Sequence, residues 1–517
     1  MQPRDDAEAT LAGEIADATA ALGIGLSPRE MPSYLPFVAE QLALVERFLA
    51  AETADGPPSP TRPMTGYRPG AAEDPYRAWL WRCELRESGA GLLTGRTVSF
   101  KDHISVAGLP QSFATDTLGG LVPDEDATVV ARVLAAGATV VGKNTMSGFT
   151  ADFQRAVNPR DPSRVTGGSS SGSAAAVAAG EVDISFGGDQ GGSSRLPAAY
   201  CGILGLKPTF SLISHYGAAF AADPSLDHIG VLTRDTEYLA RGLQAAAGAD
   251  DLDPRQRRDC PASIDVLAGL QAGIGGLRVG VLEEGFDAPI DDGVRDGVRD
   301  AIDVLRDLGA LVVPVSVPEH RHVALAYRTL AMEGARAIFV TSLLGAGART
   351  RYPAAIIEAV QEMWRDHADQ LTTPARLYHL AAEVSRRRYN GAGYARAQNA
   401  RSRYAQAYDR ALANADVLVM PTVRTTAPMV VPEDEAADAV RSALAAHWMG
   451  SPELYNLLPF NYTGHPALAV PCDPADRLPP SMQLVGRHFE DGLLLRIAHG
   501  YLARAGRLRR AAPSRSS

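Results

Sequence analysis

The chain has 517 residues, of which 46% are hydrophobic and 21% charged, and its net charge is −10. These values are ordinary for a soluble globular protein. The acidic excess argues against a nucleic-acid or membrane partner, because both favour a basic surface. No apolar run reaches the roughly 18 residues of a membrane span, and the N-terminus lacks the apolar core of a secretion signal. We therefore expect a cytoplasmic protein.

The first part of the chain, residues 1–74, is predicted to be a helical extension followed by a linker. Residues 1–50 are Ala-rich and acidic, with apolar side chains at helical spacing. Six prolines between residues 52 and 76 mark the linker. The helices are expected to pack on the main domain or on a second copy of the chain. One expectation is therefore a homodimer formed through these helices.

From residue 93 onward, predicted strands alternate with predicted helices. The first set is a strand at 96–100, a helix at 127–136 and a strand at 138–142, and the second is a strand at 277–282, a helix at 293–308 and a strand at 311–317. This alternation predicts βαβ units. We expect a three-layer α/β/α fold whose large mixed, mostly parallel sheet is covered by helices on both faces.

The predicted core is divided by a helical segment. Residues 75–320 form its first part, and residues 321–415 read as a mostly helical insertion or small lobe. Residues 416–517 complete the core, with strands predicted at 417–420 and 467–471.

Lysine is unusually scarce. Of the 50 basic residues only three are lysines, namely Lys101, Lys143 and Lys207. Arginine cannot lose its proton in a protein, whereas a buried lysine can act as a base. The three lysines are thus candidates for positions that arginine cannot fill. For Lys143 and Lys207, chance survival or tight packing is the alternative.

A segment rich in glycine and serine, residues 167–208, carries the chemistry. Two Gly-Gly-Ser steps end at Ser169 and Ser193, with a predicted helix at 173–179 and a predicted strand at 182–186 between them. The helix and strand argue against a flexible linker. A phosphate-binding loop would need a Gly-Lys-Ser/Thr ending. A nucleophile elbow centred on Ser170 would need a strand before it, where a turn sequence stands.

The segment resembles the signature of the amidase family, and the resemblance spans roughly residues 75–500. It is carried by the motifs at 98–108, 140–145, 167–172, 187–195, 197–202, 205–209, 416–422, 461–466 and 482–487. The pattern at 187–193, together with a helical N-terminal extension, is similar to the bacterial enantioselective amidases that accompany nitrile hydratases.

The resemblance implies a role for each matching residue. Ser193 would be the nucleophile, Ser169 would bridge, and Lys101 would be the terminal base, with a cis peptide between Gly168 and Ser169. A serine hydroxyl needs such a base, because it is weakly nucleophilic at neutral pH. The oxyanion would be held by the backbone N–H groups of Gln190, Gly191, Gly192 and Ser193.

Other residues near these motifs are given supporting roles. Asp189 and Arg195 are expected to brace the loop, and the Gln190 side chain either lines the substrate pocket or fills space. Packing or surface roles are expected for the four conspicuous histidines, His103, His215, His228 and His465.

The base role sets a requirement on Lys101. At an unperturbed pKa near 10.4, about one lysine in two thousand would be neutral at pH 7. Burial lowers the pKa of a lysine by disfavouring its charged form. We therefore expect Lys101 to be buried at a strand end, without a fully paired carboxylate. Asp102, the next residue along the strand, should point the other way.

The predicted activity is hydrolysis of a small-molecule carboxamide through an acyl-enzyme, releasing carboxylate and ammonia or an amine. Two alternatives stay open: a relative that transfers the acyl group to an amine or deacylates in a biosynthetic pathway, and a glutaminase-type subunit of an amidotransferase. The four scattered cysteines form no metal-binding spacing. We expect no cofactor, no metal ion and no disulfide.

Overall fold

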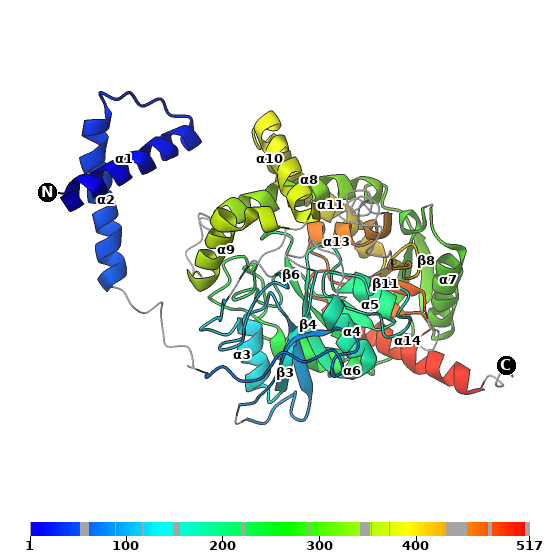
Figure 1. Ribbon diagram of the computed structural model, residues 1–517. Coiled ribbons are helices and arrows are strands. Elements are labelled where there is room, and N and C mark those ends of the chain that lie inside the picture. The colour runs from blue at the N-terminus through cyan, green and yellow to red at the C-terminus, as the bar shows by residue number, and fades with distance from the viewer. Residues whose placement is uncertain are drawn as a thin grey trace. The chain divides into compact units, whose positions relative to one another are not determined.

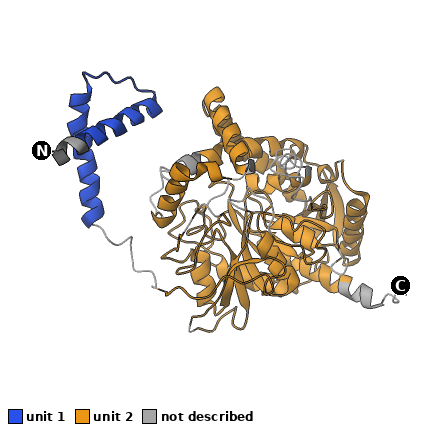
Figure 2. Cartoon of the chain, viewed as in Figure 1, with its two compact units in different colours: residues 1–59 blue, residues 60–517 orange. Residues whose placement is uncertain are grey.

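The computed structural model describes residues 2–51, 62–87, 89–115, 118, 120–147, 156–219, 223–287, 289–341, 352, 354–371, 373–430, 452–473 and 478–511. The chain divides into two compact units, residues 1–59 and residues 60–517 (Figure 2). The unit boundary therefore precedes residue 74, where the predicted linker ends. Within the described residues, no helix combines the length and the apolar character needed to cross a membrane.

The N-terminal unit consists of two helices, α1 (Gln2–Leu22) and α2 (Met31–Ala51). Both lie in the segment for which helix is predicted. Large apolar side chains of α2 are exposed, among them Phe37, Leu44, Phe48 and Leu49. An exposed apolar surface of this kind often marks an interaction site.

The second unit is built on one large sheet, in which the structure describes eleven strands (Figure 1). In chain order they are β1 (Trp79–Leu85), β2 (Thr97–Lys101), β3 (Thr139–Asn144), β4 (Ile184–Asp189), β5 (Leu204–Lys207), β6 (His228–Thr233), β7 (Arg278–Leu282), β8 (Leu311–Val315), β9 (Val417–Pro421), β10 (Ala467–Pro471) and β11 (Ser481–Val485). Their order across the sheet is β1-β3-β2-β4-β6-β5-β10-β11-β9-β7-β8.

The sheet is mixed, as predicted, but the expectation that it is mostly parallel is wrong. The parallel pairings join β2 to β3 and β4, and β7 to β8 and β9. The pairings that run from β4 through β6, β5, β10 and β11 to β9 are all antiparallel. The two predicted βαβ units were therefore identified correctly, and the centre between them was not. Short strands such as β5 and β6 carry no periodicity that reveals their direction.

Helices cover both faces of the sheet. One face is covered by α3 (Thr128–Ala135), α6 (Thr236–Ala246), α7 (Asp292–Asp307) and α14 (Asp491–Ala511). The other is covered by α4 (Ser171–Ala179), α5 (Arg195–Cys201), α8 (His320–Thr341), α11 (Ala392–Asn414) and α13 (Leu458–Thr463). The expected three-layer architecture is confirmed.

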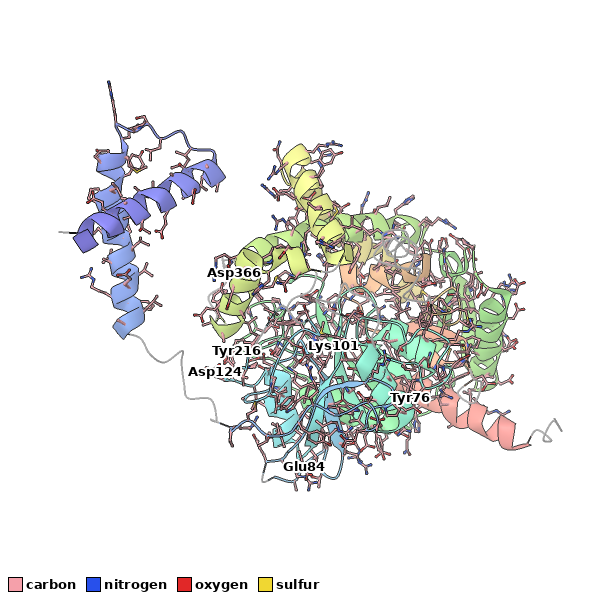
Figure 3. The ribbon with its side chains drawn as sticks, in the orientation of Figure 1. Tyr76, Glu84, Lys101, Asp124, Tyr216 and Asp366 are labelled. Atoms are coloured by element: carbon pink, nitrogen blue, oxygen red, sulfur yellow. The ribbon has the colours of Figure 1, made fainter. Side chains whose placement is uncertain are left out.

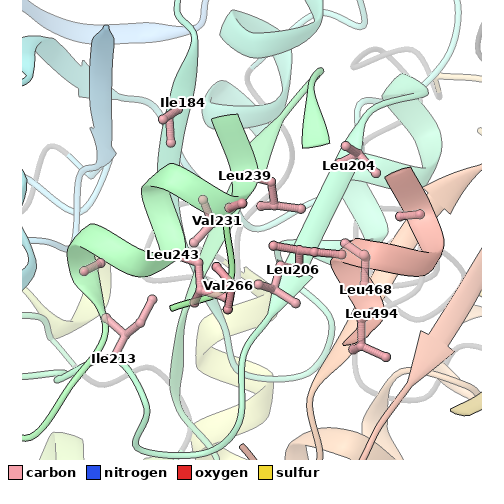
Figure 4. Packing of buried hydrophobic residues seen from close by; sticks show 14 of the residues in the cluster. Ile184, Leu204, Leu206, Ile213, Val231, Leu239, Leu243, Val266, Leu468 and Leu494 are labelled. Carbon is pink, nitrogen blue, oxygen red and sulfur yellow. The ribbon is translucent and has the colours of Figure 1, made fainter. Parts of the chain in front are cut away.

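Strand β9 shows how one strand serves both layers. Val417 and Val419 belong to the core under α7 and α14, while Leu418 and Met420 belong to the core under α8 and α11. Successive side chains of a strand point to opposite faces, so a continuous apolar run is what a doubly covered strand requires. Figure 4 shows the first of these cores, where Leu239 and Leu494 of two helices meet Leu206 and Leu468 of two strands.

The helical segment predicted at 321–415 holds α8, α9 (Ala354–Asp366), α10 (Thr373–Tyr389) and α11. The first and last of these helices, α8 and α11, pack on the sheet through buried side chains such as Tyr327 and Tyr408. The segment thus forms part of the helical layer within the second unit.

Candidate active site

Lys101 ends strand β2 and is fully buried (Figure 3). Its Nζ lies 2.6 Å from the hydroxyl of Ser169, to which it donates a hydrogen bond. Two residues far apart in sequence are therefore joined as the relay requires. The strand fixes the backbone of Lys101 between β3 and β4, which flank it.

The environment of Lys101 favours the neutral amine. Burial lowers the pKa of Lys101 to about 7, while the negative charges of Asp189 and Asp227 act to raise it. Because the effect of burial is the larger, an appreciable fraction of the amine is neutral near pH 7. A terminal base needs this property.

Asp102, the neighbour of Lys101, is paired elsewhere. Its carboxylate lies 3.2 Å from Lys143 Nζ, and both side chains are buried. The second carboxylate oxygen accepts hydrogen bonds from the backbone N–H and hydroxyl of Ser112 and from the backbone N–H of Ala114. Asp102 thus neutralises Lys143 and not Lys101. The ion pair gives Lys143 a specific partner that the sequence did not reveal.

The first serine loop leads into helix α4. The peptide bond between Gly168 and Ser169 is cis, and Ser169 is buried. Ser170 is also buried, and its hydroxyl donates to the carbonyl of Gly188 at 3.0 Å. A nucleophile must meet the substrate, so the burial and engagement of Ser170 disfavour the elbow alternative.

Ser193 lies in the turn between β4 and α5 and is only half-buried. The backbone N–H of Ser170 donates to the Ser193 carbonyl at 3.3 Å, which brings the two Gly-Gly-Ser steps together. Among the described residues, however, no hydrogen bond joins the Ser193 hydroxyl to Ser169. The structure thus shows the contact between Lys101 and Ser169, while the contact between Ser169 and Ser193 that the resemblance implies is not seen among the described residues.

An ion pair between Asp189 and Arg195 braces this turn. The Arg195 guanidinium donates to both carboxylate oxygens, at 3.0 and 2.9 Å, and both residues are fully buried. Burial would raise the pKa of Asp189, but the charge and hydrogen bonds of Arg195 outweigh it and hold that pKa well below its usual range. Arg195 also donates to Leu457 O, Gln483 Oε1 and Asn461 Oδ1. These partners come from the C-terminal part of the core.

The contacts within the turn leave only some of the predicted oxyanion donors available. The Gly192 N–H donates to Asp189 Oδ1 at 2.9 Å, so this predicted oxyanion donor is engaged in bracing. In the described part of the chain, the N–H groups of Gln190, Gly191 and Ser193 have no protein acceptor. These three remain candidates for binding an oxyanion.

Two buried polar side chains lie beside the turn without hydrogen-bond partners among the described residues, the amide of Gln190 and the imidazole of His103. Both approach Gly188, since a Cβ added there would lie 2.5 Å from Gln190 Nε2 and 2.7 Å from His103 Nε2. Burial, followed by the charge of Lys101, lowers the pKa of His103 well below its usual value. His103 is therefore a neutral imidazole near the relay.

The turn has a further partner from helix α8 that the sequence did not indicate. The Tyr327 hydroxyl donates to the Gln190 carbonyl at 2.6 Å. Tyr327 is fully buried, and its position depends on how a distant helix packs. No local motif marks it.

The other residues singled out from the sequence have packing or bracing contacts. Lys207 donates to the carbonyl of Pro208 at 2.9 Å. His228 Nδ1 lies 2.7 Å from the Leu226 carbonyl, and His215 is buried next to His103 with ring centroids 6.3 Å apart. All four cysteines are free thiols.

Comparison with known proteins gives a consistent result. A model of the amidase family matches residues 78–495. An enantioselective amidase of Rhodococcus rhodochrous is 36% identical over 487 residues, covering 92% of each chain. A glutamyl-tRNA(Gln) amidotransferase subunit of Methanococcoides burtonii is 35% identical and covers 80% of this chain and 85% of its own. The native peptide amidase of Stenotrophomonas maltophilia superimposes with a TM-score of 0.62 at 29% identity, covering 80% of this chain and 84% of its own.

Proposed function

Because the chain belongs to the amidase family and is an amide-hydrolysing enzyme, we propose that Ser193 attacks the carboxamide and that Ser169 and Lys101 relay the proton. The observation that carries this proposal is the 2.6 Å contact between Lys101 Nζ and Ser169 Oγ in a fully buried setting. The pKa of Lys101, lowered by burial to about 7, makes the amine a usable base.

In the acylation step, Ser193 Oγ forms a bond to the carbonyl carbon. Its proton passes to Ser169 Oγ, while the Ser169 proton passes to the neutral Lys101 amine. The negative charge that develops on the carbonyl oxygen is held by the N–H groups of Gln190, Gly191 and Ser193. One such donor is typically worth about 3–4 kcal/mol in the transition state.

The tetrahedral intermediate then collapses. The C–N bond breaks, and the relay returns a proton to the leaving nitrogen, which departs as ammonia or an amine. Water attacks the acyl-enzyme and passes a proton into the same relay. Ser193 leaves with a proton, and the carboxylic acid is released as the carboxylate.

The roles of the serines are tested by labelling and substitution. A fluorophosphonate probe should modify Ser193, and Ser193→Ala and Lys101→Met should each abolish turnover of a simple carboxamide, with circular dichroism showing an intact fold. The matched control is Ser170→Ala, which removes a buried hydroxyl engaged with Gly188. Labelling of Ser170, or near-full activity of either main variant, would overturn the mechanism.

Water is proposed as the natural acyl acceptor and the chain as a stand-alone enzyme. The 35% identity to a subunit of an amidotransferase favours one alternative, a glutaminase that acts within a larger assembly. Turnover of a panel of aliphatic, aromatic and aminoacyl amides by the purified chain alone would support the proposal. Activity on glutamine that appears only with partner chains would favour the alternative. Mass analysis with an added amine tests acyl transfer.

We propose that the N-terminal helices mediate a homodimer. The support is the exposed apolar surface of α2, which includes Phe37 and Phe48. Covering such a surface with a second copy would remove apolar area from water. Light scattering of the full chain should give twice the monomer mass, and Phe48→Glu should return it to the monomer mass.

The proposed compartment is the cytoplasm. Four unpaired thiols are typical of a reducing environment. Fractionation of cells that produce the protein tests this assignment.

A further inference from the structure

Three side chains that take no part in the proposed relay meet near the C-terminal part of the core. They are Asp409 on α11, His465 after α13 and His488 after β11. One ligand atom from each lies within 4.8 Å of those of the other two. His465 Nε2 is 3.1 Å from Asp409 Oδ1, and the two imidazole rings are 4.2 Å apart between centroids.

Thr463 contacts the imidazole rings of both His465 and His488. His488 Nε2 lies 3.1 Å from the Thr463 carbonyl, which can only accept, so Nε2 carries the proton and Nδ1 has a free lone pair. His465 Nδ1 lies 2.9 Å from Thr463 Oγ1, and that hydroxyl can donate to the Pro459 carbonyl at 2.9 Å while accepting from His465. In this tautomer, His465 Nε2 also has a free lone pair. Without a cation, the 3.1 Å contact between Nε2 and the Asp409 carboxylate needs a proton on Nε2, so a cation that binds there displaces that proton.

We infer that Asp409, His465 and His488 bind a Zn²⁺ ion through one carboxylate and two imidazoles. Two imidazole nitrogens and a carboxylate oxygen are a ligand set that Zn²⁺ favours, with solvent in the fourth position. Imidazoles that bind metal almost always donate their second N–H to a carbonyl or carboxylate. The two contacts to Thr463 supply comparable anchors.

The distances fit the cation. Ligands about 2.0–2.1 Å from a tetrahedral zinc lie about 3.3 Å from one another, close to the 3.1 Å between His465 Nε2 and Asp409 Oδ1. The remaining ligand atoms lie within 4.8 Å of one another, and the Asp409 side chain is 53% exposed, so it has room to turn toward an ion. The exposed carboxylate also gives the ion a path from solvent.

The surrounding charge permits a cation. Arg257 acts on all three residues electrostatically, and Lys207 acts on His465. The Arg257 guanidinium is paired with Asp259, with Nη2 and Oδ2 2.6 Å apart. Burial lowers the pKa of Lys207 well below its usual value, which reduces its positive charge. The ion would replace a single His465–Asp409 contact by a link between three segments. Its role is therefore to hold α11, the α13 turn and the β11 turn together, apart from the serine relay.

The experiment uses the full chain, stripped with chelator and dialysed against Zn²⁺. Metal analysis should show one zinc per chain, and thermal unfolding should move to a higher temperature with zinc than without it. His465→Ala and Asp409→Asn should each weaken zinc binding by more than ten-fold. Thr463→Val, which keeps all three ligands and removes only the hydroxyl anchor, should weaken it by about 10- to 100-fold.

His322→Ala is the matched control, because it removes an exposed histidine of α8 outside the cluster. Asp409→Asn changes a partly exposed side chain and guards against a variant that fails to fold. Retention of no zinc by the wild-type chain, or equal binding by the cluster variants and the control, would overturn the site. Amide turnover, measured in parallel, reports on the relay separately.

Discussion

Two fully buried lysines at the ends of neighbouring parallel strands have different partners. Lys101 on β2 contacts a serine hydroxyl, and Lys143 on β3 contacts the Asp102 carboxylate. The strands are in register, with Lys143 beside Phe100 and Asn144 beside Lys101. Burial lowers the pKa of both amines. At Lys143 the charge of Asp102 and a hydrogen bond to it act in the opposite direction, whereas at Lys101 only the charges of Asp189 and Asp227 do so, without a hydrogen bond.

The difference shows how a lysine can be kept as a base one residue away from a carboxylate. A buried Asp102 without a partner would favour the ammonium form of Lys101. Because Asp102 is paired with Lys143, its carboxylate does not hold the proton on Lys101.

The largest expected effect is on turnover. Lys101→Arg keeps a positive charge but cannot accept a proton, so kcat should fall by about 10²- to 10⁴-fold, the usual contribution of a general base. Lys143→Arg keeps the ion pair with Asp102 and should lose far less. Equal losses in steady-state assays of the two variants would show that the two lysines do not have different roles.

The next effect is on stability. Lys143→Met leaves the Asp102 carboxylate buried without its cation, which should cost about 3–5 kcal/mol in the free energy of unfolding. The double variant Asp102→Asn/Lys143→Met should recover part of this loss, since neither charge remains. Urea denaturation measures both values, and a double variant as unstable as the sum of the single changes would argue against a coupled pair.

A third effect is on the pH dependence of kcat/KM. In the proposed relay the neutral amine of Lys101 is the base, so kcat/KM should rise with pH through about 7. Asp227 raises that pKa, and Asp227→Asn should therefore move the rise to lower pH. A pH profile with no inflection in this region in the wild-type enzyme would contradict the role of Lys101.

Within a single pH unit, the smallest effect is on stability as a function of pH. The pKa of Lys101 is lower in the folded chain, about 7, than in the unfolded chain. Between pH 7 and about 10 the unfolded chain therefore binds the extra proton, and stability rises with pH. For each pH unit in this window, the free energy of unfolding of the wild type should rise by up to about 1.4 kcal/mol more than that of Lys101→Met. Parallel curves for the two proteins would refute the shift.

Much of the fold was open to prediction because it rests on local pattern. The strands at β2, β3, β7, β8 and β9 follow apolar runs, and the helices between them follow 3.6-residue periodicity. The antiparallel centre was not predicted, because strand direction depends on where the chain returns after long excursions. Residues 431–451, within the predicted C-terminal part of the core, lie outside the described residues.

The site was accessible from the sequence to a similar extent. Lysine scarcity made Lys101 one of three candidates, and the motifs around the two Gly-Gly-Ser steps carried the family resemblance that implies roles for Lys101, Ser169 and Ser193. The partners that arise from packing were not indicated: Lys143 for Asp102, and Tyr327 for the turn. The cluster at His465 was missed for the same reason, as its members are 23 or more residues apart.

The contacts of Arg195 bear on how the protein matures. Its side chain joins the turn that holds Ser193 to Leu457, Asn461 and Gln483, which follow it by more than 260 positions. During synthesis, Lys101, Ser169 and Ser193 are therefore made long before the residues that brace the turn of Ser193. We therefore expect the chain to become active only near the end of synthesis. Fragments that end before residue 457 should not hydrolyse amides.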